Sequence, residues 1–513
     1  MAGRRRLRSF ACLALSVATA GLGTSSCRPK PPVTAPALEP TPSTPAPVSP
    51  SIARLRRDID TIFSAPQLEP GTWGVVVRSL RTDETLYEHN ARKLLSPASN
   101  LKIVTLAATA EQLGWDFTYE TQLLALGPVA SGTLEGDLVV RGSGDPSLVQ
   151  DQGMADSVFR DWAERLKGLG IRAIAGRVLG DDDAFDEETY GSGWMWDDMN
   201  EAFSAGVGAL QFNMGETTVT VAPGSAAGAP AQISCATEGS GLVLRNRVVT
   251  SAAGVSARVS TRRVANTNVL EVSGTVPVGG APVEHRIAVD NQTLFFVTEL
   301  RKALIANGID VRGYAVDIDD LPVAPQVQAA VPLFSYRSPP LSQLADTLMK
   351  LSQNQYAETL LKTLGARHGT PTFDAGRQVV VDILRGWGIE ASQLLQADGS
   401  GLSRYDLVSA DVLARVLAHV ARDPKLDGPF RASLPVAGMP GMLSGRLKGT
   451  PAAGHVQAKT GSMRHIRSTS GYTQTADGEP VVFSIIANNY GIPNAEVDRT
   501  ADAIILAVFT FRR

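Results

Sequence analysis

The chain has 513 residues, of which 43% are hydrophobic and 19% are charged. This length exceeds one ordinary domain, so we expect a globular protein with more than one domain. With 48 basic and 51 acidic residues and a net charge of -3, the chain offers no polycationic surface for a phosphate backbone, which argues against a nucleic-acid partner.

The N-terminus has the pattern of an export signal. Residues 1–27 contain a basic head, a short apolar stretch and then small residues, as secretory signals do. Residues 28–50 follow as a linker in which 9 of the 22 residues from Pro29 to Pro50 are proline, typical of a semi-rigid polyproline II spacer. Cys27 lies between the two and resembles a bacterial lipoprotein junction, where a lipid on the cysteine would anchor the protein. Cleavage and release without a lipid is the alternative.

Cysteine and histidine usage argues against disulfides and metal in the body of the chain. Cys12 and Cys27 lie near the N-terminus, which leaves Cys235 without an internal partner. The six histidines are scattered along the sequence, and a lone histidine is more often packed or solvated than a metal ligand. We therefore expect no metal site and no cofactor.

Both ends of the body contain strands and helices that suit one sheet. Residues 54–63 predict a helix, residues 73–90 two strands joined by a polar turn, and residues 96–114 a second helix. Near the C-terminus, alternation predicts three strands over residues 455–489, and residues 497–511 form an amphipathic helix. These elements indicate one sheet assembled from both termini.

The middle of the chain differs from both ends in its composition and in its predicted elements. It contains short predicted strands at residues 120–127, 136–148 and 174–185, followed by a region rich in Gly, Ala, Val and Thr at about residues 216–284. A helix at residues 290–308 and a strand at residues 313–318 close this stretch, and the chain becomes helical again from about residue 339. We therefore expect an insertion between the two halves of the terminal sheet, followed by a helical part.

The helix at residues 96–114 brings a nucleophile and a base together. Residues i and i+3 share a helix face, so Ser99 and Lys102 point into the same space. A serine hydroxyl is a poor nucleophile at neutral pH and needs a base within hydrogen-bond reach. Lys102 can act as that base if it loses its charge, through burial or through a second cation nearby such as Lys459.

Two further motifs suit the same chemistry. Ser352 and Asn354 stand ahead of a predicted helix and supply a hydroxyl that can relay a proton and an amide that can hold a peptide bond. Lys459, Thr460 and Gly461 lie on a predicted strand near the C-terminus. Each motif is common on its own. Ser-x-x-Lys, Ser-x-Asn and Lys-Thr-Gly in this order are the signature of penicillin-binding proteins and serine β-lactamases.

The chain resembles the low-molecular-mass class C penicillin-binding proteins that act as D-alanyl-D-alanine carboxypeptidases and endopeptidases. The resemblance is carried by the segments LLSPASNLKIVTLAA, GDLVVRGSGDPSL, GWMWDDM, DGSGLSR and AKTGSM, and it spans about residues 55–513. Ser352 follows Ser99 by about 250 residues, which fits a family that carries extra domains between these motifs. Peptidoglycan peptides are then the implied substrates and β-lactams the implied covalent inhibitors, in the bacterial periplasm or cell envelope.

The implied fold is an α/β (α+β) penicillin-recognising, transpeptidase-like domain. In this fold an antiparallel sheet is flanked by helices, and mostly β domains are inserted between the first and second motifs. We assign residues 51–115 and 323–513 to the catalytic penicillin-binding domain, residues 116–215 and 285–322 to the inserted domain, and residues 216–284 to a nested β-rich domain.

The resemblance also implies catalytic roles. Ser99 would attack the D-alanyl carbonyl, Lys102 would accept its proton, and Ser352 would pass a proton to the leaving D-alanine. The oxyanion hole would consist of the backbone N–H groups of Ser99 and Ser462.

Four residues are expected to hold the substrate backbone. Asn354 and Lys459 would bind it directly, with Lys459 and Thr460 facing its terminal carboxylate. Gly461 would let a ligand approach the strand closely, because glycine has no side chain.

The acidic stretch DDDAFDEETYGSGWMWDDM, residues 181–199, is the candidate specificity segment. A solvated acidic loop is the simpler interpretation, but two tryptophans beside the acids weigh against it. The resemblance implies that Asp198 and Arg404 bind the free end of a diaminopimelate side chain, whose ammonium and carboxylate suit one acid and one guanidinium. Phe203 would flank this pocket, and Met463 would line it.

Two other functions stay open at this point. A β-lactamase shares the three motifs, but no carboxylate in the sequence can be assigned to activate water. A catalytically weak, peptidoglycan-binding lipoprotein is the other alternative, and such a protein has no need of Lys102.

Overall fold

The computed structural model describes residues 49–150, 153–323 and 325–513. The expected export signal, nearly all of the proline-rich linker, and Cys27 lie outside the described residues. Among the described helices, none combines the length and the apolar character that a bilayer crossing requires.

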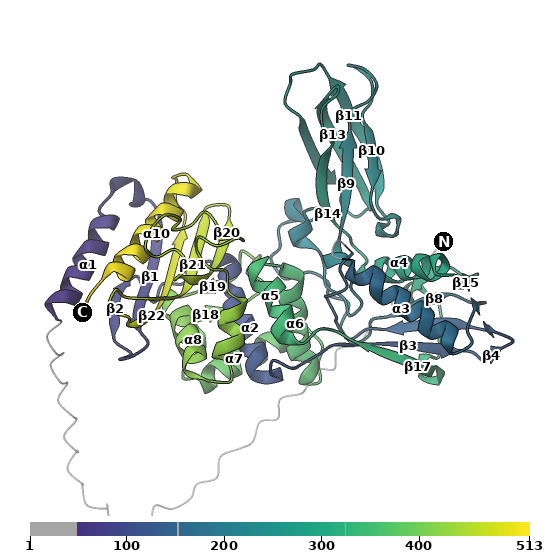
Figure 1. The fold of residues 1–513 in the computed structure, drawn as a ribbon, viewed down its shortest axis with the longest axis horizontal. Helices are drawn as coiled ribbons and strands as arrows, with labels where there is room; N and C mark the ends of the chain where they lie inside the picture. Colours follow the sequence, from purple (N-terminus) through teal and green to yellow (C-terminus); the bar gives the residue numbers. More distant parts are fainter. Residues whose placement is uncertain (1–48, 151–152, 324) are drawn as a thin grey trace, which may run out of the picture. The chain divides into compact units, whose positions relative to one another are not determined.

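The two ends of the chain form one five-stranded antiparallel sheet with the strand order β2-β1-β22-β21-β20 (Figure 1). The N-terminal part supplies β1 (Thr72–Ser79) and β2 (Thr85–His89), and the C-terminal part supplies β20 (Gln457–Met463), β21 (Ile466–Gln474) and β22 (Pro480–Asn488). β1 pairs with β22 along its whole length. The prediction of one sheet built from both termini is therefore confirmed.

Helices cover both faces of this sheet. Val75 and Val77 of β1 pack with α1 (Pro50–Phe63) and α10 (Asn494–Thr510). Val76 faces the other way and packs with α2 (Leu101–Leu113) and α8 (Ala410–Arg422), because successive strand residues point to opposite faces. β1 and β22 are accordingly runs of buried apolar residues rather than half-polar strands.

The start of α2 differs from a regular helix. Ser99 lies in a 3-10 turn, η2 (Ala98–Asn100), that leads directly into α2. Ala98 has a φ of 47°, in the left-handed region that residues with a side chain seldom occupy. Every residue of α2 from Leu101 to Ala110 is buried, so this helix runs through the core and holds η2 firmly against the sheet.

Three further helices pack against α2: α5 (Leu341–Lys350), α6 (Asn354–Arg367) and α7 (Phe373–Gly386). A short helix, α9 (Asp427–Ser433), packs in turn on α5 and α8. Ser352 lies in the break between α5 and α6, and its φ is 59°. A left-handed serine here lets the chain turn sharply and begin α6 with Asn354.

The inserted region contains two sheets and two helices around its own core. The larger sheet, in spatial order, contains β16 (Ala315–Asp317), β8 (Val178–Asp181), β6 (Asp137–Arg141), β3 (Glu120–Leu126) and β17 (Val331–Arg337). The smaller one contains β15 (Asp310–Val311), β7 (Ala173–Ile174), β5 (Thr133–Leu134) and β4 (Val129–Ala130), and the helices are α3 (Met154–Gly168) and α4 (Gln292–Ala306). β17 pairs with β3, so the inserted sheet extends past residue 322, where we placed the end of the inserted domain.

The stretch expected to form a nested β-rich domain consists of two three-stranded sheets. One contains β10 (Gln232–Cys235), β9 (Glu216–Ala222) and β14 (Val283–Ala288), and the other β11 (Val243–Ser251), β13 (Val269–Pro277) and β12 (Arg258–Arg263). A small core that includes Val219, Val248 and Leu270 lies between them. None of the residues assigned to the active site lies on these six strands.

Candidate active site

A cleft of about 440 Å³ lies at the start of α2 and brings most of the expected site residues together. The expected residues that line it are Ser99, Asp198, Phe203, Ser352, Asn354, Arg404, Thr460, Ser462 and Met463. Lys102 and Lys459 are fully buried next to it. Residues more than 350 positions apart in the sequence therefore share one site.

Lys102 contacts three oxygen atoms and nothing else polar among the described residues. Its Nζ lies 2.9 Å from Ser99 Oγ, 2.6 Å from Asn354 Oδ1 and 2.9 Å from the carbonyl oxygen of Ser400. A neutral lysine has two N–H bonds and one lone pair, and the amide and carbonyl oxygens can only accept. When Lys102 is neutral, its lone pair is therefore directed at the hydroxyl of Ser99.

Burial makes the neutral form of Lys102 accessible. Loss of water lowers the pKa of its ammonium to about 8, while the nearby carboxylates of Asp398, Glu358 and Asp406 act in the opposite direction. We expected either burial or a second cation to lower this pKa, and burial is the cause. The ammonium of Lys102, in turn, adds to the effect of burial on Lys459 and helps to hold the pKa of Lys459 well below its usual range.

Lys459 supports Ser352 rather than facing the cleft. Its Nζ lies 2.8 Å from Ser352 Oγ and 2.7 Å from the carbonyl oxygen of Thr460. We expected Lys459 to face the terminal carboxylate of a substrate, but Ser352 and Thr460 line the cleft in its place. A bound carboxylate would contact these two residues first. The ammonium of Lys459, behind them, would attract it when charged.

Asn354 is engaged at both ends of its side chain. Its Oδ1 accepts a hydrogen bond from Lys102, and its Nδ2 donates one to the carbonyl oxygen of Phe203 at 2.7 Å. In this structure it therefore ties Lys102 to the inserted region. Its second N–H and the second lone pair of Oδ1 have no partner among the described residues, and Asn354 lines the cleft, so holding a substrate peptide bond stays a prediction.

Gly461 is required by the backbone around Ser99. A Cβ at this position would lie 2.9 Å from the backbone nitrogen of Ser99 and 2.6 Å from the carbonyl oxygen of Pro97, both too close for any side chain. We expected a ligand to approach here, but the close neighbour is η2 itself. The contact places Ser462, the next residue of β20, beside Ser99.

A buried glutamate that our sequence analysis missed fixes the loop next to Lys102. Glu358, on α6, accepts hydrogen bonds from the backbone N–H groups of Gly399 at 2.7 Å and Ser400 at 2.8 Å. Thr105 Oγ1 of α2 donates to the carbonyl oxygen of Gly399 at 2.7 Å. These bonds hold the carbonyl oxygen of Ser400 in place for Lys102. Burial, together with the charge of Asp398, raises the pKa of Glu358 to about 8.

Asp398 organises the rest of this loop. Its carboxylate accepts hydrogen bonds from the backbone N–H groups of Ser400, Gly401 and Ser403 and from Nε1 of Trp194, at distances from 2.6 to 3.0 Å. Trp194 is thus an anchor between the acidic stretch and the loop. The glycines of the DGSGLSR segment were the sequence signal for this loop. Gly401 has to be glycine, because a Cβ there would collide with the carbonyl oxygen of Ala98.

Two acids and two arginines also line the cleft: Asp197, Asp198, Arg404 and Arg464. Asp198 belongs to η3 (Trp196–Asp198), and Arg404 Nη1 donates to the carbonyl oxygen of Arg464 at 3.1 Å. Burial raises the pKa of Asp198, as does the charge of Asp197, while Arg404 and Arg464 oppose the shift. Among the described residues no ion pair joins Asp198 to Arg404, so both side chains are available to a ligand.

A match to a protein family accounts for this arrangement. The D-Ala-D-Ala carboxypeptidase 3 (S13) family matches residues 55–509, which include the three motifs and both halves of the sheet. The chain belongs to this family. It is a serine peptidase of the D-Ala-D-Ala carboxypeptidase type, as the three motifs implied.

Individual proteins show the same likeness. A D-alanyl-D-alanine carboxypeptidase of Actinomadura sp. (strain R39) is 36% identical over 471 residues, which cover 89% of this chain and 85% of that protein. The D-alanyl-D-alanine carboxypeptidase DacB of Haemophilus influenzae is 29% identical over 434 residues, covering 82% and 86%. The crystal structure of penicillin-binding protein 4 (dacB) from Haemophilus influenzae has a TM-score of 0.75 at 26% identity and covers 89% of this chain and 97% of that one.

Proposed function

We propose that this S13 family enzyme hydrolyses the terminal D-Ala-D-Ala bond of peptidoglycan stem peptides, and the equivalent D-alanyl bond in cross-links, through an acyl-enzyme on Ser99. One observation carries the assignment of the nucleophile. Lys102 Nζ is held by Asn354 Oδ1 and the carbonyl oxygen of Ser400, so the remaining direction is that of Ser99 Oγ.

The first half of the reaction follows from these contacts. Lys102 takes the proton of Ser99 while Ser99 Oγ attacks the carbonyl carbon of the penultimate D-alanine. The carbonyl oxygen becomes negative and is stabilised by the backbone N–H groups of Ser99 and Ser462. The C–N bond then breaks, the leaving D-alanine takes a proton from Ser352, and Lys459 lies 2.8 Å from Ser352 to replace it.

The second half releases the peptide. A water molecule attacks the ester carbon and gives a proton through Ser352 to Lys459, which regains the proton that it lost in the first half. The bond to Ser99 Oγ breaks, and Ser99 takes its proton back from Lys102. In a carboxypeptidase reaction the first product is free D-alanine. In an endopeptidase reaction it is a second stem peptide, and the leaving group is the side-chain amine through which that peptide was cross-linked.

We assign the part of the cleft lined by Asp198 and Arg404 to the diaminopimelate side chain of the stem peptide. Asp198 suits the ammonium group, and Arg404 can bind the carboxylate with two hydrogen bonds. Phe203 and Met463 line the same cleft and suit the methylene chain between these charges. The resemblance to class C penicillin-binding proteins and the lining of the cleft support this assignment.

We also propose export to the bacterial periplasm or cell envelope. The basic and apolar N-terminal sequence supports it, and so does a wall substrate. Attachment of a lipid to Cys27 stays a prediction. Labelling of cells with a radioactive fatty acid tests it, because the protein would incorporate label and its Cys27→Ser variant would not.

Purified enzyme and two defined substrates test the catalytic proposal. One substrate is a diaminopimelate-containing pentapeptide and the other a cross-linked peptide dimer, and mass spectrometry identifies the products. We expect free D-alanine from the first, monomers from the second, or both, and we expect Ser99→Ala to abolish every product. If the wild-type protein left both substrates intact, the binding-protein alternative would replace our proposal. Rapid, repeated turnover of penicillin would favour the β-lactamase alternative.

A further inference from the structure

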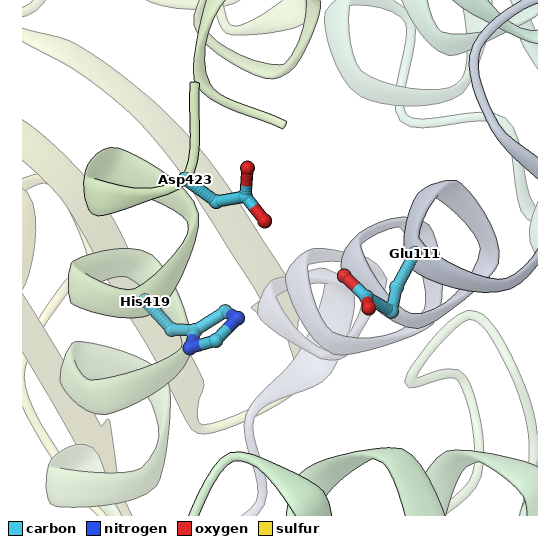
Figure 2. A group of neighbouring side chains, drawn as sticks. All are labelled: Glu111, His419 and Asp423. Carbon is cyan, nitrogen blue, oxygen red and sulfur yellow. The ribbon is translucent and has the colours of Figure 1, made fainter. Parts of the chain in front are cut away.

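Three side chains of types that commonly bind metal ions come together between α2 and the end of α8, away from the active-site cleft. Glu111, His419 and Asp423 each offer one ligand atom, and these atoms lie within 4.8 Å of one another. Figure 2 shows Glu111 on one helix facing His419 and Asp423, which lie on and just after the last turns of the other. None of these residues lines the active-site cleft.

Contacts with neighbouring residues hold this arrangement. His419 lies in the last turn of α8, and Asp423 is the residue that caps its C-terminal end. Trp387 stacks on the ring of His419, with 4.1 Å between the ring centroids and 21° between their planes. Trp115, just after α2, donates from Nε1 to the carbonyl oxygen of Lys425 at 3.0 Å, which ties the end of α2 to the segment that follows Asp423.

The charges around the cluster leave two carboxylates for a cation. Three arginines share a pocket with His419 and Asp423, but each is paired with Asp83 or Asp411: Arg78, Arg415 and Arg422. Neither Glu111 nor Asp423 forms an ion pair with any lysine or arginine among the described residues. Glu111 lies in the last turn of α2 and Asp423 caps the end of α8. The C-terminal end of a helix carries partial negative charge. Two carboxylates thus face each other between two negative helix ends.

We propose that Glu111, His419 and Asp423 bind a zinc ion. One imidazole nitrogen with two carboxylate oxygens is a donor set that suits zinc, whereas calcium and magnesium prefer oxygen ligands alone. Glu111 is exposed and the other two residues are half-buried, so water can complete the coordination.

The ion joins α2 to α8 and takes no part in acyl transfer. Glu111 is nine residues beyond Lys102 on the same helix, about 14 Å along its axis. The bound ion therefore affects how firmly α8 packs against α2. Because this site is separate, the proposal does not depend on the substrate of the enzyme.

Calorimetric titration of the mature chain with zinc chloride, after treatment with a chelator and its removal, tests this proposal. We expect one ion per chain, and we expect Glu111→Gln and His419→Gln each to weaken binding by at least about tenfold. His368→Gln is the matched control, because His368 is an exposed histidine at the end of α6, and it should bind zinc as the wild-type protein does. Acylation of each variant by benzylpenicillin shows that it is folded.

Two results would overturn the proposal. Zinc binding that is absent, or that both Glu111→Gln and His419→Gln retain at full strength, would remove these residues as ligands. Calcium binding as tight as zinc binding would show that the imidazole does not contribute, and the site would then not be a zinc site.

Discussion

Glu358 and Lys102 are linked through a single peptide unit. The carboxylate of Glu358 accepts the N–H groups of Gly399 and Ser400, and the carbonyl oxygen of Ser400 accepts a hydrogen bond from Lys102. When Glu358 is ionised, its charge also favours the charged form of Lys102, and because burial raises the pKa of Glu358 to about 8, this charge develops as the pH rises toward that value. Glu358 is thus a positioning residue for Lys102, through geometry and, where it is ionised, through charge.

Replacing Glu358 by Gln should slow acylation and shift its pH dependence. The amide of glutamine would place an N–H group against one of the two backbone N–H groups, and two donors repel each other. We therefore expect the loop to move and the acylation rate to fall by at least about tenfold, or about 1.4 kcal/mol. Loss of the negative charge should move the midpoint of the pH–rate profile to lower pH. The rate constant for acylation by benzylpenicillin, measured across pH, gives both quantities.

Thr105→Val is the control for Glu358→Gln. It removes the hydrogen bond from Thr105 Oγ1 to the carbonyl oxygen of Gly399 without changing any charge. We expect a lower rate and an unchanged midpoint. Equal midpoints in the wild-type, Thr105→Val and Glu358→Gln proteins would show that Glu358 acts through the fold alone.

Asn354→Asp should shift the pH profile in the opposite direction. Asn354 Oδ1 lies 2.6 Å from Lys102 Nζ, and a carboxylate at this distance raises the pKa of a lysine by about 1 to 3 units. We expect acylation at pH 7 to fall by at least about tenfold and to recover partly at high pH. A uniform loss at every pH would mean that Asn354 acts on the substrate and not on Lys102.

The wild-type enzyme should itself show a rise in rate around pH 8. Burial lowers the pKa of Lys102 to about 8, and only the neutral amine can take the proton of Ser99. The neutral fraction, and with it the acylation rate, should therefore increase about tenfold between pH 7 and pH 9. A profile that is flat over this range would contradict a pKa near 8 for the group that takes the proton of Ser99.

Asp198→Ala should change substrate choice without changing the chemistry. We expect cleavage of diaminopimelate-containing peptides to slow by at least about tenfold, or about 1.4 kcal/mol, because the ammonium of the side chain loses its partner. Acylation by benzylpenicillin, which lacks this side chain, should stay nearly unchanged. Arg404→Ala should slow diaminopimelate peptides more than lysine peptides, which have no carboxylate at that end. Equal losses on peptide and penicillin would mean that Asp198 supports the fold.

Local patterns in the sequence predicted the frame of the active site. Ser99 and Lys102 are three residues apart on one helical stretch, and β20, β21 and β22 were predicted as strands from their own residues, so neither depended on distant contacts. The place of β17 was different. Our sequence analysis assigned no strand to residues 331–337, and its partner, β3, shows that β17 belongs to the inserted sheet; β3 lies about 200 residues earlier.

Distant pairs explain what the sequence could not show. Glu358 lies on α6 among apolar residues, and nothing in its neighbourhood in the sequence connects it with Gly399 and Ser400. Lys459 could be placed on a strand but not behind Ser352, because that depends on the left-handed turn at Ser352. Glu111 and His419 are about 300 residues apart, so their proximity could not be seen in the sequence.

The attachment site of penicillin tests most directly whether Ser99, paired with Lys102, is the nucleophile. The purified protein is incubated with benzylpenicillin, and the mass of the intact chain and of its peptides locates the adduct. We predict one adduct per chain, on the peptide that contains Ser99, and none in Ser99→Ala or Lys102→Ala. An adduct on Ser352, or labelling of Ser99→Ala at the wild-type rate, would contradict the assignment.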